Sequence, residues 1–460
     1  MPLRESPFLK VRHLHFIGIG GIGMSGIARI CHTLGYHVAG SDLRESEMVR
    51  DLRALGLVVH LGHRGENLGE AQVVVTSSAV SPGNPELRAA VERGIPVIQR
   101  GEMLAELMRL KYGIAVAGTH GKTTTTAMVS AVLIEGGLSP TTVVGGKWMA
   151  INSNAELGQS QFLVCESDES DGSFLKLAPV ITVVTNVDLD HMDHYKTEEN
   201  LQLSFLQFIN KTPFYGKAIL CADDPRLAGL LGEVEKPKLT YGFSERAALR
   251  ASQMRYEDGA MGFDVSLAGE SLGRFQLRVP GRHNVLNALA AIAVGLELEV
   301  PVEKIQRGLG GFGGVARRMT TVGSLGHWRV IDDYGHHPTE LRATIEAVRL
   351  TTRKLSVVFQ PHRYSRTLAL YREFAEVLAL ADRVYLLDIY AAGEAAIPDV
   401  TSGLIFERLG AHPAAQWVKD RGALAARLAA DHGEGEGVIL TIGAGDVYRI
   451  GYGLCGLEAP

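Results

Sequence analysis

The stretch AVAGTHGKTTTT, from Ala115 to Thr126, joins a strand-like apolar run to a glycine turn and then to a lysine followed by four threonines. A glycine turn of this kind lets backbone N–H groups approach phosphate oxygens, and the helix that follows directs its positive end at them. Lys122 is placed to reach the outer phosphates, and the Thr123 hydroxyl to ligate magnesium. The stretch therefore predicts a nucleoside triphosphate site and chemistry driven by ATP.

This turn departs from the common phosphate-loop pattern G-x-x-x-x-G-K-[ST]. Val116, and not a glycine, stands five residues before Gly121. The form present is GTHGKT, from Gly118 to Thr123, which is a contracted version of the pattern. This contracted form reduces the number of protein families that the sequence fits.

Outside the turn, short β-branched runs alternate with longer amphipathic stretches. Examples are LHFIGIG, AQVVVTSS, FLVCE, VITVVTN, LSVVFQ and VILTIG. Such alternation predicts parallel sheets in α/β domains. It restarts near Gly113 and again after the glycine-rich segment from Gly308 to Gly314, which we expect to be a hinge. We therefore expect three domains, at about 1–112, 113–314 and 315–460.

Composition limits the classes of function. The chain has 460 residues, 46% of them hydrophobic and 21% charged, and a formal net charge of −5. This balance argues against nucleic-acid or anionic-membrane partners. The N-terminal stretch MPLRESPFLKVRHLHF lacks the apolar core of a signal peptide, and no apolar span reaches 18 residues. We expect a cytoplasmic protein, monomeric or homodimeric, whose cysteines are reduced thiols.

A second glycine-rich turn lies near the N-terminus, after the run LHFI. It contains Gly18, Gly20, Gly21 and Gly23, and Asp42 ends the next predicted strand. This placement matches a dinucleotide-binding fingerprint, in which glycines admit a diphosphate to a helix N-terminus and an acid contacts a ribose. On this motif alone, a structural strand–helix junction, an NAD site and a UDP-sugar site all stay open.

Acidic residues follow two predicted strands of the middle segment. Glu166 ends FLVCE, where a carboxylate beside a phosphate loop is placed to hold magnesium, directly or through water. His191 lies between acids in VDLDHMDH and is either a ligand for a second cation or a hydrogen-bonded loop residue. The turn after Glu166 contains three further acids that fit a solvated loop equally well, Asp168, Glu169 and Asp171.

Two later motifs carry amide and guanidinium groups. Asn284 and Asn287 lie three residues apart in GRHNVLN, a helical spacing suited to hydrogen-bonding an adenine edge. Capping of the helix by Asn284 is the alternative. Arg363 and Arg366 follow the run LSVVFQ and form a clamp for a carboxylate or phosphate, or else lie unpaired on an exposed helix turn.

In this order, the motifs closely resemble those of the Mur ligase family, the ATP-dependent ligases that build the peptide of bacterial cell-wall precursors. The resemblance implies Rossmann-like N-terminal and C-terminal domains around a central ATPase-like domain with a phosphate loop. DDYGHHP and PHRYSRT further resemble the alanine-adding branch. The resemblance covers nearly the whole chain and rests on GIGGIGMSGIA, GTHGKTTTT, ESDESDGSF, NVDLDHMDHY, GRHNVLNALAA, GVARRM, DDYGHHPTE, FQPHRYSRT, DIYAAGE and LTIGAGD.

The family resemblance implies a two-step reaction. The D-lactoyl carboxylate of UDP-N-acetylmuramate would attack the γ-phosphate of ATP to give an acyl phosphate and ADP. The amine of L-alanine would then displace phosphate. Cationic groups would stabilise the charge that accumulates on the phosphoryl group and on the tetrahedral oxygens. The implied metal is Mg²⁺, with Mn²⁺ as a substitute.

The resemblance also implies roles for single residues. Lys122 would hold the β- and γ-phosphates, and Lys122, His191 and Arg318 (with Arg317) are the implied catalytic groups. Magnesium would be held by Thr123, Glu166 and, at a second position, His191. The implied ATP site comprises Gly118, Thr119, His120, Gly121, Lys122, Thr123, Thr124, His283, Asn284, Asn287, Arg318 and Asp333. The UDP-sugar site comprises Gly18, Gly20, Gly21, Gly23, Met24, Ser25, Asp42, Ser77 and Ser78, and the L-alanine site Tyr334, His336, Arg363 and Arg366.

Two places differ from patterns found in the family. Several members carry a carbamylated lysine downstream of the D-H-M-D motif, where this chain reads Ser204-Phe205-Leu206. The alanine-adding branch also lacks that lysine, so its absence agrees with the resemblance. Asn152 stands where glycine is expected in GGKWMAIN, which leaves the sugar contacts of that segment undefined.

Three other functions compete with this interpretation. A recycling ligase that joins a preformed tripeptide to the same UDP-sugar shares the architecture. An NAD-dependent oxidoreductase built on the turn at Gly18 leaves the phosphate loop and the arginine motifs unexplained. A non-catalytic nucleotide-binding module leaves unexplained why three ligand sites converge. Because the implied ligands come from all three domains, we expect the domains to close on ATP and UDP-sugar.

Overall fold

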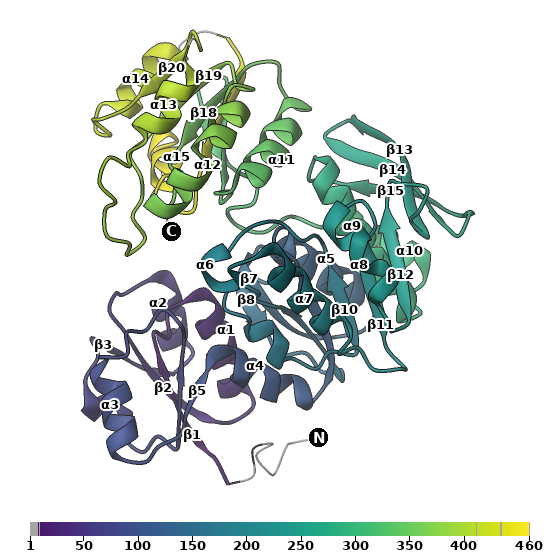
Figure 1. The fold of residues 1–460 in the computed structure, drawn as a ribbon, viewed down its shortest axis with the longest axis vertical. Helices are drawn as coiled ribbons and strands as arrows, with labels where there is room; N and C mark the ends of the chain where they lie inside the picture. Colours follow the sequence, from purple (N-terminus) through teal and green to yellow (C-terminus); the bar gives the residue numbers. More distant parts are fainter. Residues whose placement is uncertain (1–7, 9, 411, 433–434, 460) are drawn as a thin grey trace. The chain divides into compact units, whose positions relative to one another are not determined.

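The structure, a computed structural model, describes residues 8, 10–410, 412–432 and 435–459 (Figure 1). Of the N-terminal stretch discussed above, residues 1–7 and 9 lie outside this description. None of the helices in the described ranges combines the length and the apolar character needed to cross a membrane. The chain divides into two compact units, which are Met1–Met254 with Phe263–Gln276 and Leu286–Phe312, and Arg255–Gly262 with Leu277–Val285 and Gly313–Pro460.

The N-terminal sheet is parallel and, among the described residues, has the order β3-β2-β1-β4-β5. Strand order reverses between β1 and β4, and the loops after two such strands diverge and leave room for a ligand. The glycine turn follows β1 and Ser77 follows β4, so both lie at this edge. The elements are β1 (His13–Ile17), α1 (Ile22–Thr33), β2 (His37–Asp42), α2 (Glu47–Ala54), β3 (Val58–Leu61), η1 (Gly65–Leu68), β4 (Val73–Thr76), α3 (Pro85–Glu92), β5 (Val97–Gln99) and α4 (Arg100–Arg109).

The middle sheet has the order β15-β14-β13-β12-β11-β10-β6-β9-β7-β8 over the part of the chain that is described. The parallel strands β9, β6 and β10 are neighbours at its centre, so their carboxyl ends meet at one edge. Its strands are β6 (Tyr112–Ala117), β7 (Thr141–Trp148), β8 (Ser153–Glu156), β9 (Phe162–Glu166), β10 (Ile181–Val184), β11 (Lys217–Cys221), β12 (Lys238–Gly242), β13 (Leu249–Glu257), β14 (Ala260–Leu267) and β15 (Glu270–Leu277). Its helices are α5 (Lys122–Glu135), η2 (Ser173–Lys176), α6 (Met192–Tyr195), α7 (Glu198–Ile209), α8 (Pro225–Leu230), η3 (Leu231–Glu233), α9 (Arg282–Glu297) and α10 (Val302–Gly310).

The glycine-rich segment predicted as a hinge is partly helical. Gly308 belongs to α10, and a Cβ atom at that position would lie only 3.0 Å from the Cα of Val132 in α5. This glycine therefore serves the close packing of two helices. The boundary between the two compact units falls between Phe312 and Gly313, so the hinge prediction was wrong for the residues within α10.

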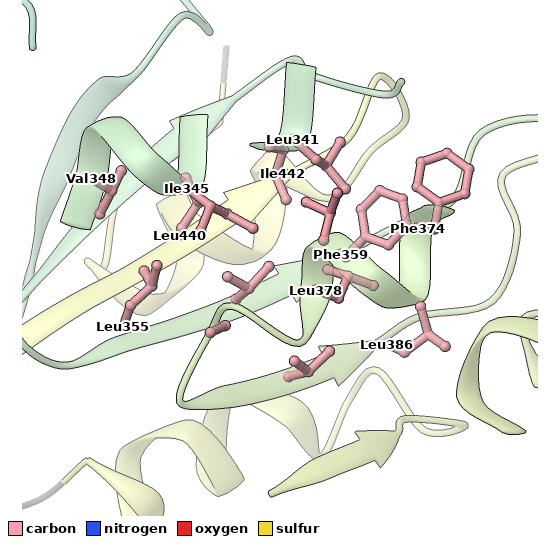
Figure 2. Close-up of a cluster of buried hydrophobic side chains, with 14 of the residues drawn as sticks. Leu341, Ile345, Val348, Leu355, Phe359, Phe374, Leu378, Leu386, Leu440 and Ile442 are labelled. Carbon is pink, nitrogen blue, oxygen red and sulfur yellow. The ribbon is translucent and has the colours of Figure 1, made fainter. Parts of the chain in front are cut away.

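The C-terminal sheet has the order β16-β17-β21-β18-β19-β20 within the described residues, and β16 is its antiparallel edge. One face is covered by α11 and α12, whose apolar side chains pack on β18, β19 and β21 (Figure 2). In α11, Leu341, Ile345 and Val348 recur at the helical spacing that places them on one face. The elements are β16 (Thr320–Leu325), β17 (Trp328–Asp333), α11 (Pro338–Arg349), β18 (Leu355–Phe359), α12 (Tyr364–Leu378), β19 (Arg383–Leu386), α13 (Gly403–Leu409), β20 (Ala415–Trp417), α14 (Leu424–Asp431), β21 (Gly437–Ile442) and α15 (Tyr448–Leu454).

The three sheets confirm the predicted α/β class with three domains. The cysteines are free, and Cys31, Cys165 and Cys221 are buried, as their apolar surroundings in the sequence predicted.

Candidate active site

The phosphate loop connects β6 to α5, and its glycines are required by the backbone. Gly118 has φ +128° and Gly121 has φ +82°, a region that side chains with a Cβ atom rarely adopt. A Cβ atom on Gly118 would also lie 2.1 Å from Thr185 Oγ1. Gly121 is the N-cap residue of α5, so the loop delivers the chain directly to a helix N-terminus.

The segment after β10 holds the phosphate loop in place. The His120 amide donates to Asn186 Oδ1 at 2.8 Å, and the Asp188 amide donates to Thr119 Oγ1 at 2.8 Å. The Thr185 hydroxyl donates to the His120 carbonyl at 2.6 Å. These bonds run between two neighbouring strand ends and fix the loop before any ligand arrives.

Lys122 is largely but not fully buried next to this loop, with 15% of its side chain exposed. Its Nζ donates to the carbonyls of Gly118 at 2.6 Å and Thr119 at 3.1 Å, and to Glu169 Oε1 at 2.8 Å. Burial would lower the pKa of Lys122, but the charges of Glu169 and Glu166 raise it. Burial raises the pKa of Glu169 to about 7. The lysine therefore stays charged in a site from which water is largely excluded.

Two of the acids that also fitted a solvated loop are engaged in ion pairs. The Glu169 side chain is 2% exposed and contacts Lys122. Asp168 accepts a hydrogen bond from Arg100 Nη2 at 2.5 Å. The solvated-loop alternative was therefore wrong for both, whereas Asp171 is exposed. Neither partner could be identified from the sequence, because Glu169 lies 47 residues from Lys122 and Asp168 lies 68 residues from Arg100.

Thr123 and Glu166 lie together next to the loop. Thr123 Oγ1 donates to Glu166 Oε2 at 2.8 Å, and the Gly145 amide donates to the same oxygen at 2.9 Å. A hydroxyl and a carboxylate are donors that Mg²⁺ accepts. His191 has φ +58°, and its Nε2 lies 3.9 Å from Glu169 Oε1. The structure thus brings the three predicted metal-binding residues to one group of strand ends.

The glycine turn after β1 lies next to Asp42, the acid that we expect to contact a ribose. The Gly20 amide donates to Asp42 Oδ2 at 2.9 Å. Gly18 has φ +73°, which favours glycine. Met24 and Ser25 are buried in the first turn of α1, Ser77 is half-buried and Ser78 is exposed.

A residue of the middle domain reaches the first turn of α1. Asn154 Nδ2 donates to Ser25 Oγ at 2.9 Å. Nearby, Asn152 adopts φ +48°, a conformation that glycine adopts freely and asparagine tolerates better than most residues. This explains why asparagine stands at a position where the family pattern led us to expect glycine.

Arg317 and Arg318 are adjacent in the chain but make different contacts. Arg317 Nη2 donates to the Gly443 carbonyl at 2.8 Å, and its guanidinium lies 4.4 Å from the centre of the Tyr448 ring. The Arg318 guanidinium lies 5.2 Å from the centre of the Tyr334 ring. Arg317 is thus held by contacts inside its own unit, and Arg318 Nη1 lies 3.8 Å from Glu340 Oε1.

Asp333 and His283 lie in the surroundings of Arg318. Asp333 accepts hydrogen bonds from the amides of Met319 and Gly335, each at 2.8 Å, and burial raises the pKa of its carboxyl. Burial and the charge of Arg318 lower the pKa of His283 to about 4, so its imidazole is neutral at neutral pH.

The two asparagines make separate contacts. Asn284 is the third residue of α9, and its Nδ2 donates to the Pro280 carbonyl at 2.7 Å, so Gly281 and not Asn284 precedes the helix. Asn287 Oδ1 accepts a hydrogen bond from Thr125 Oγ1 at 3.1 Å.

Aromatic contacts join the loops after β17 and β18. The ring centres of Tyr334 and His336 lie 5.4 Å apart, and those of His336 and His362 lie 5.5 Å apart. Burial, together with the charges of His336 and the nearby arginines, lowers the pKa of His362 to about 3. Arg363 is exposed with φ +69°. His336 thus links Tyr334 to His362, and the charges of Arg363 and Arg366 act on the His362 ring. Sequence reasoning gave His362 no role, because a lone histidine carries no spacing signal.

Comparison with known proteins matches each part of the chain to a family model. Residues 13–112 match the Mur ligase family catalytic domain, 116–295 the Mur ligase middle domain, and 317–445 the Mur ligase glutamate ligase domain. A UDP-N-acetylmuramate–L-alanine ligase of Syntrophotalea carbinolica is 52% identical over 97% of this chain and 98% of its own length.

Solved structures agree with these matches. A UDP-N-acetylmuramate–alanine ligase of Thermotoga maritima aligns with a TM-score of 0.82 and 30% identity over 96% of this chain and 98% of its own. A murein peptide ligase of Psychrobacter arcticus aligns with a TM-score of 0.70 and 24% identity over 96% and 98% of the two chains, which shows a shared fold. The phosphate loop, the strand-end acids and these matches together establish that the chain belongs to the Mur ligase family.

Proposed function

We propose that the chain ligates L-alanine to the D-lactoyl carboxylate of UDP-N-acetylmuramate, with conversion of ATP to ADP and phosphate. The observation that carries this proposal is the convergence of Lys122, Thr123 and Glu166 at one sheet edge. It occurs in a chain that is about half identical, over nearly its full length, to relatives named for this reaction. An oxidoreductase gives no reason for that cluster, and a non-catalytic nucleotide-binding module gives none for the high identity to relatives named for this ligation.

The phosphate loop supplies the groups that phosphoryl transfer needs. Lys122 is charged, so it would stabilise the β- and γ-phosphates by exchanging one of the three hydrogen bonds that its Nζ makes within the protein. Mg²⁺ would be held by Thr123 and Glu166, and a second ion by His191; when bound, the ions neutralise charge on the phosphoryl oxygens. Arg318 would add a further cation, and its charge helps to keep the nearby His283 neutral.

The amino acid would be held by the loops after β17 and β18. Arg363 and Arg366 would take its carboxylate through paired N–H donors. Tyr334 and His336 lie in the loop that packs against His362, so they would border the same ligand. Because His362 is neutral, it leaves the positive charge for the carboxylate to the arginines.

Substrate omission tests the proposed reaction. ADP release is measured with UDP-N-acetylmuramate, ATP, Mg²⁺ and L-alanine, and then with each one left out. We expect continued ADP release and an amide-linked UDP product only in the complete mixture. When L-alanine alone is omitted, we expect about one ADP per enzyme, formed together with an acyl phosphate that borohydride reduces to an alcohol. ADP release that ignores UDP-N-acetylmuramate would refute the proposed function.

A further inference from the structure

Arg100 is the first residue of α4, and its side chain reaches the glycine turn after β1. A Cβ atom placed on Gly23 would lie 2.7 Å from Arg100 Nη1 and 3.4 Å from its Cζ. The backbone of Gly23 is outside the left-handed region, so its conformation accepts any residue. A glycine stands here because the guanidinium occupies the space that a side chain would need.

The other edge of the same guanidinium is anchored. Arg100 Nη2 donates to Asp168 Oδ2 at 2.5 Å, and Asp168 Oδ1 accepts the Ser170 amide at 3.0 Å. Asp168 therefore holds the Nη2 atom of Arg100, while its Nη1 atom lies over the glycine turn near Gly23.

The start of α4 is fixed as well. A Cβ atom on Gly101 would lie 2.7 Å from the Ser173 Cβ, which places the helix directly against η2. Glu102 forms an ion pair with Lys176 at 2.9 Å. The Arg100 side chain is 23% exposed, so it is positioned by the protein and still open to a ligand.

The glycine turn by itself supplies too little positive charge to balance a bound diphosphate. The segment from Gly18 to Ser25 contains no lysine or arginine, and its neighbour Asp42 is acidic. A helix N-terminus supplies only about half a positive charge, whereas a diphosphate brings more than one negative charge. The turn needs further positive charge, and Arg100 is in place to give it.

We propose that Arg100 binds the diphosphate of the UDP-sugar through Nη1 while Asp168 holds Nη2, and that Gly23 is glycine to make room for this side chain. The inference rests on the proposed function only in taking a UDP-sugar as the ligand. It assigns Arg100 to substrate binding and Asp168 to its positioning.

Direct binding of uridine 5′-diphosphate to the full-length chain, measured by calorimetry, tests the role of Arg100. We expect Arg100→Gln to weaken binding about 10- to 100-fold, the effect of losing a charge-assisted contact. Arg100→Lys keeps the charge but loses the two-pronged set of N–H donors. Its affinity for uridine diphosphate should therefore lie between those of Arg100→Gln and the wild type. The matched control is Arg109→Gln at the other end of α4, where the side chain is 70% exposed, and it should bind as the wild type does.

A double-mutant cycle tests the relation between Gly23 and Arg100. Gly23→Ala should weaken binding of uridine diphosphate in the wild-type background, because the added methyl displaces the guanidinium. In an Arg100→Ala background the same change should alter binding less than about twofold. If Gly23 served only the backbone of the turn, both backgrounds would lose affinity equally.

Retained ATP binding by each variant shows that the fold is intact. Equal affinity of Arg100→Gln and wild type for uridine diphosphate would overturn the inference and leave the proposed function standing. Failure of the wild-type chain to bind uridine diphosphate at all would contradict both.

Discussion

At the scale of single residues, Lys122 and Glu169 couple stability to catalysis. Lys122→Met removes the cation of the phosphate loop, so we expect ligase turnover to fall at least about a thousandfold. It also leaves the Glu169 carboxyl buried without its partner, which costs about 3–5 kcal/mol of folding free energy. Thermal unfolding and ADP release, measured on the same preparation, report the two effects separately.

The double variant Lys122→Met with Glu169→Gln separates these roles. Because it leaves no charge without a partner, it should recover most of the lost stability and none of the lost activity. Recovery of activity by the double variant would mean that Lys122 acts only as the partner of Glu169.

A second residue-scale prediction concerns Glu86, which is fully buried in the N-terminal domain. Its Oε2 accepts the Ser41 hydroxyl at 2.5 Å and lies 3.2 Å from His15 Nε2, and its Oε1 accepts Asn67 Nδ2 at 2.6 Å. Burial alone would raise the pKa of Glu86, but these hydrogen bonds from His15, Ser41 and Asn67 lower it from 4.5 to about 2.

The sign of the pH effect follows from this depressed pKa. Between pH 4.5 and about 2 the unfolded chain binds a proton that the folded chain does not. Glu86 therefore contributes about 3 kcal/mol above pH 4.5, and this stability is lost as the pH falls toward 2. Glu86→Gln should flatten the acid limb of stability against pH, whereas the exposed control Glu70→Gln should leave it unchanged. An equally steep limb in Glu86→Gln would contradict the assignment.

At the scale of elements, the carboxyl ends of β6, β9 and β10 bring the proposed magnesium ligands together, and the strand β7 beside β9 places Gly145 against Glu166. A Cβ atom on Gly145 in β7 would lie 2.2 Å from Glu166 Oε2. Gly145→Ala should therefore push the carboxylate away from Thr123, and we expect the Mg²⁺ concentration for half-maximal activity to rise about tenfold. Titration of activity with Mg²⁺ measures this. The control is Gly229→Ala in α8, where an added Cβ atom would have no neighbour within 4 Å. An unchanged Mg²⁺ requirement in Gly145→Ala would count against Glu166 as a magnesium ligand.

The strands also show which parts of the fold could be predicted from the sequence. Each strand-like run quoted at the outset contains a strand, because buried parallel strands are continuous apolar runs. The strands from β12 to β15 and the strand β7 were not predicted, since their residues alternate or include glycine. Motif residues such as Lys122 and Glu166 could be identified from local spacing. The partners Glu169 and Arg100 could not, because only the folded chain brings them to the motifs.

At the scale of the whole molecule, the first predicted domain and most of the second lie within one compact unit, whereas Arg255–Gly262 and Leu277–Val285 of the second belong to the other. Contacts between the first and second domains include the ion pair of Lys147 with Glu47 at 2.6 Å. We therefore expect limited digestion with proteinase K to cut first between Gly311 and Gly314, and not near residue 112, where α4 leads almost directly into β6. Mass spectrometry of the first fragments locates the cut. A first cut near residue 112 would contradict this division.

The central claim is that L-alanine is the amine substrate, and it is tested by comparing L-alanine with the alternative amine. With UDP-N-acetylmuramate, ATP and Mg²⁺ present, phosphate release and the mass of the UDP product are compared for L-alanine and for the cell-wall tripeptide. We predict rapid phosphate release and a product enlarged by one alanine residue with L-alanine, and little product with the tripeptide. A product formed only with the tripeptide would contradict this account.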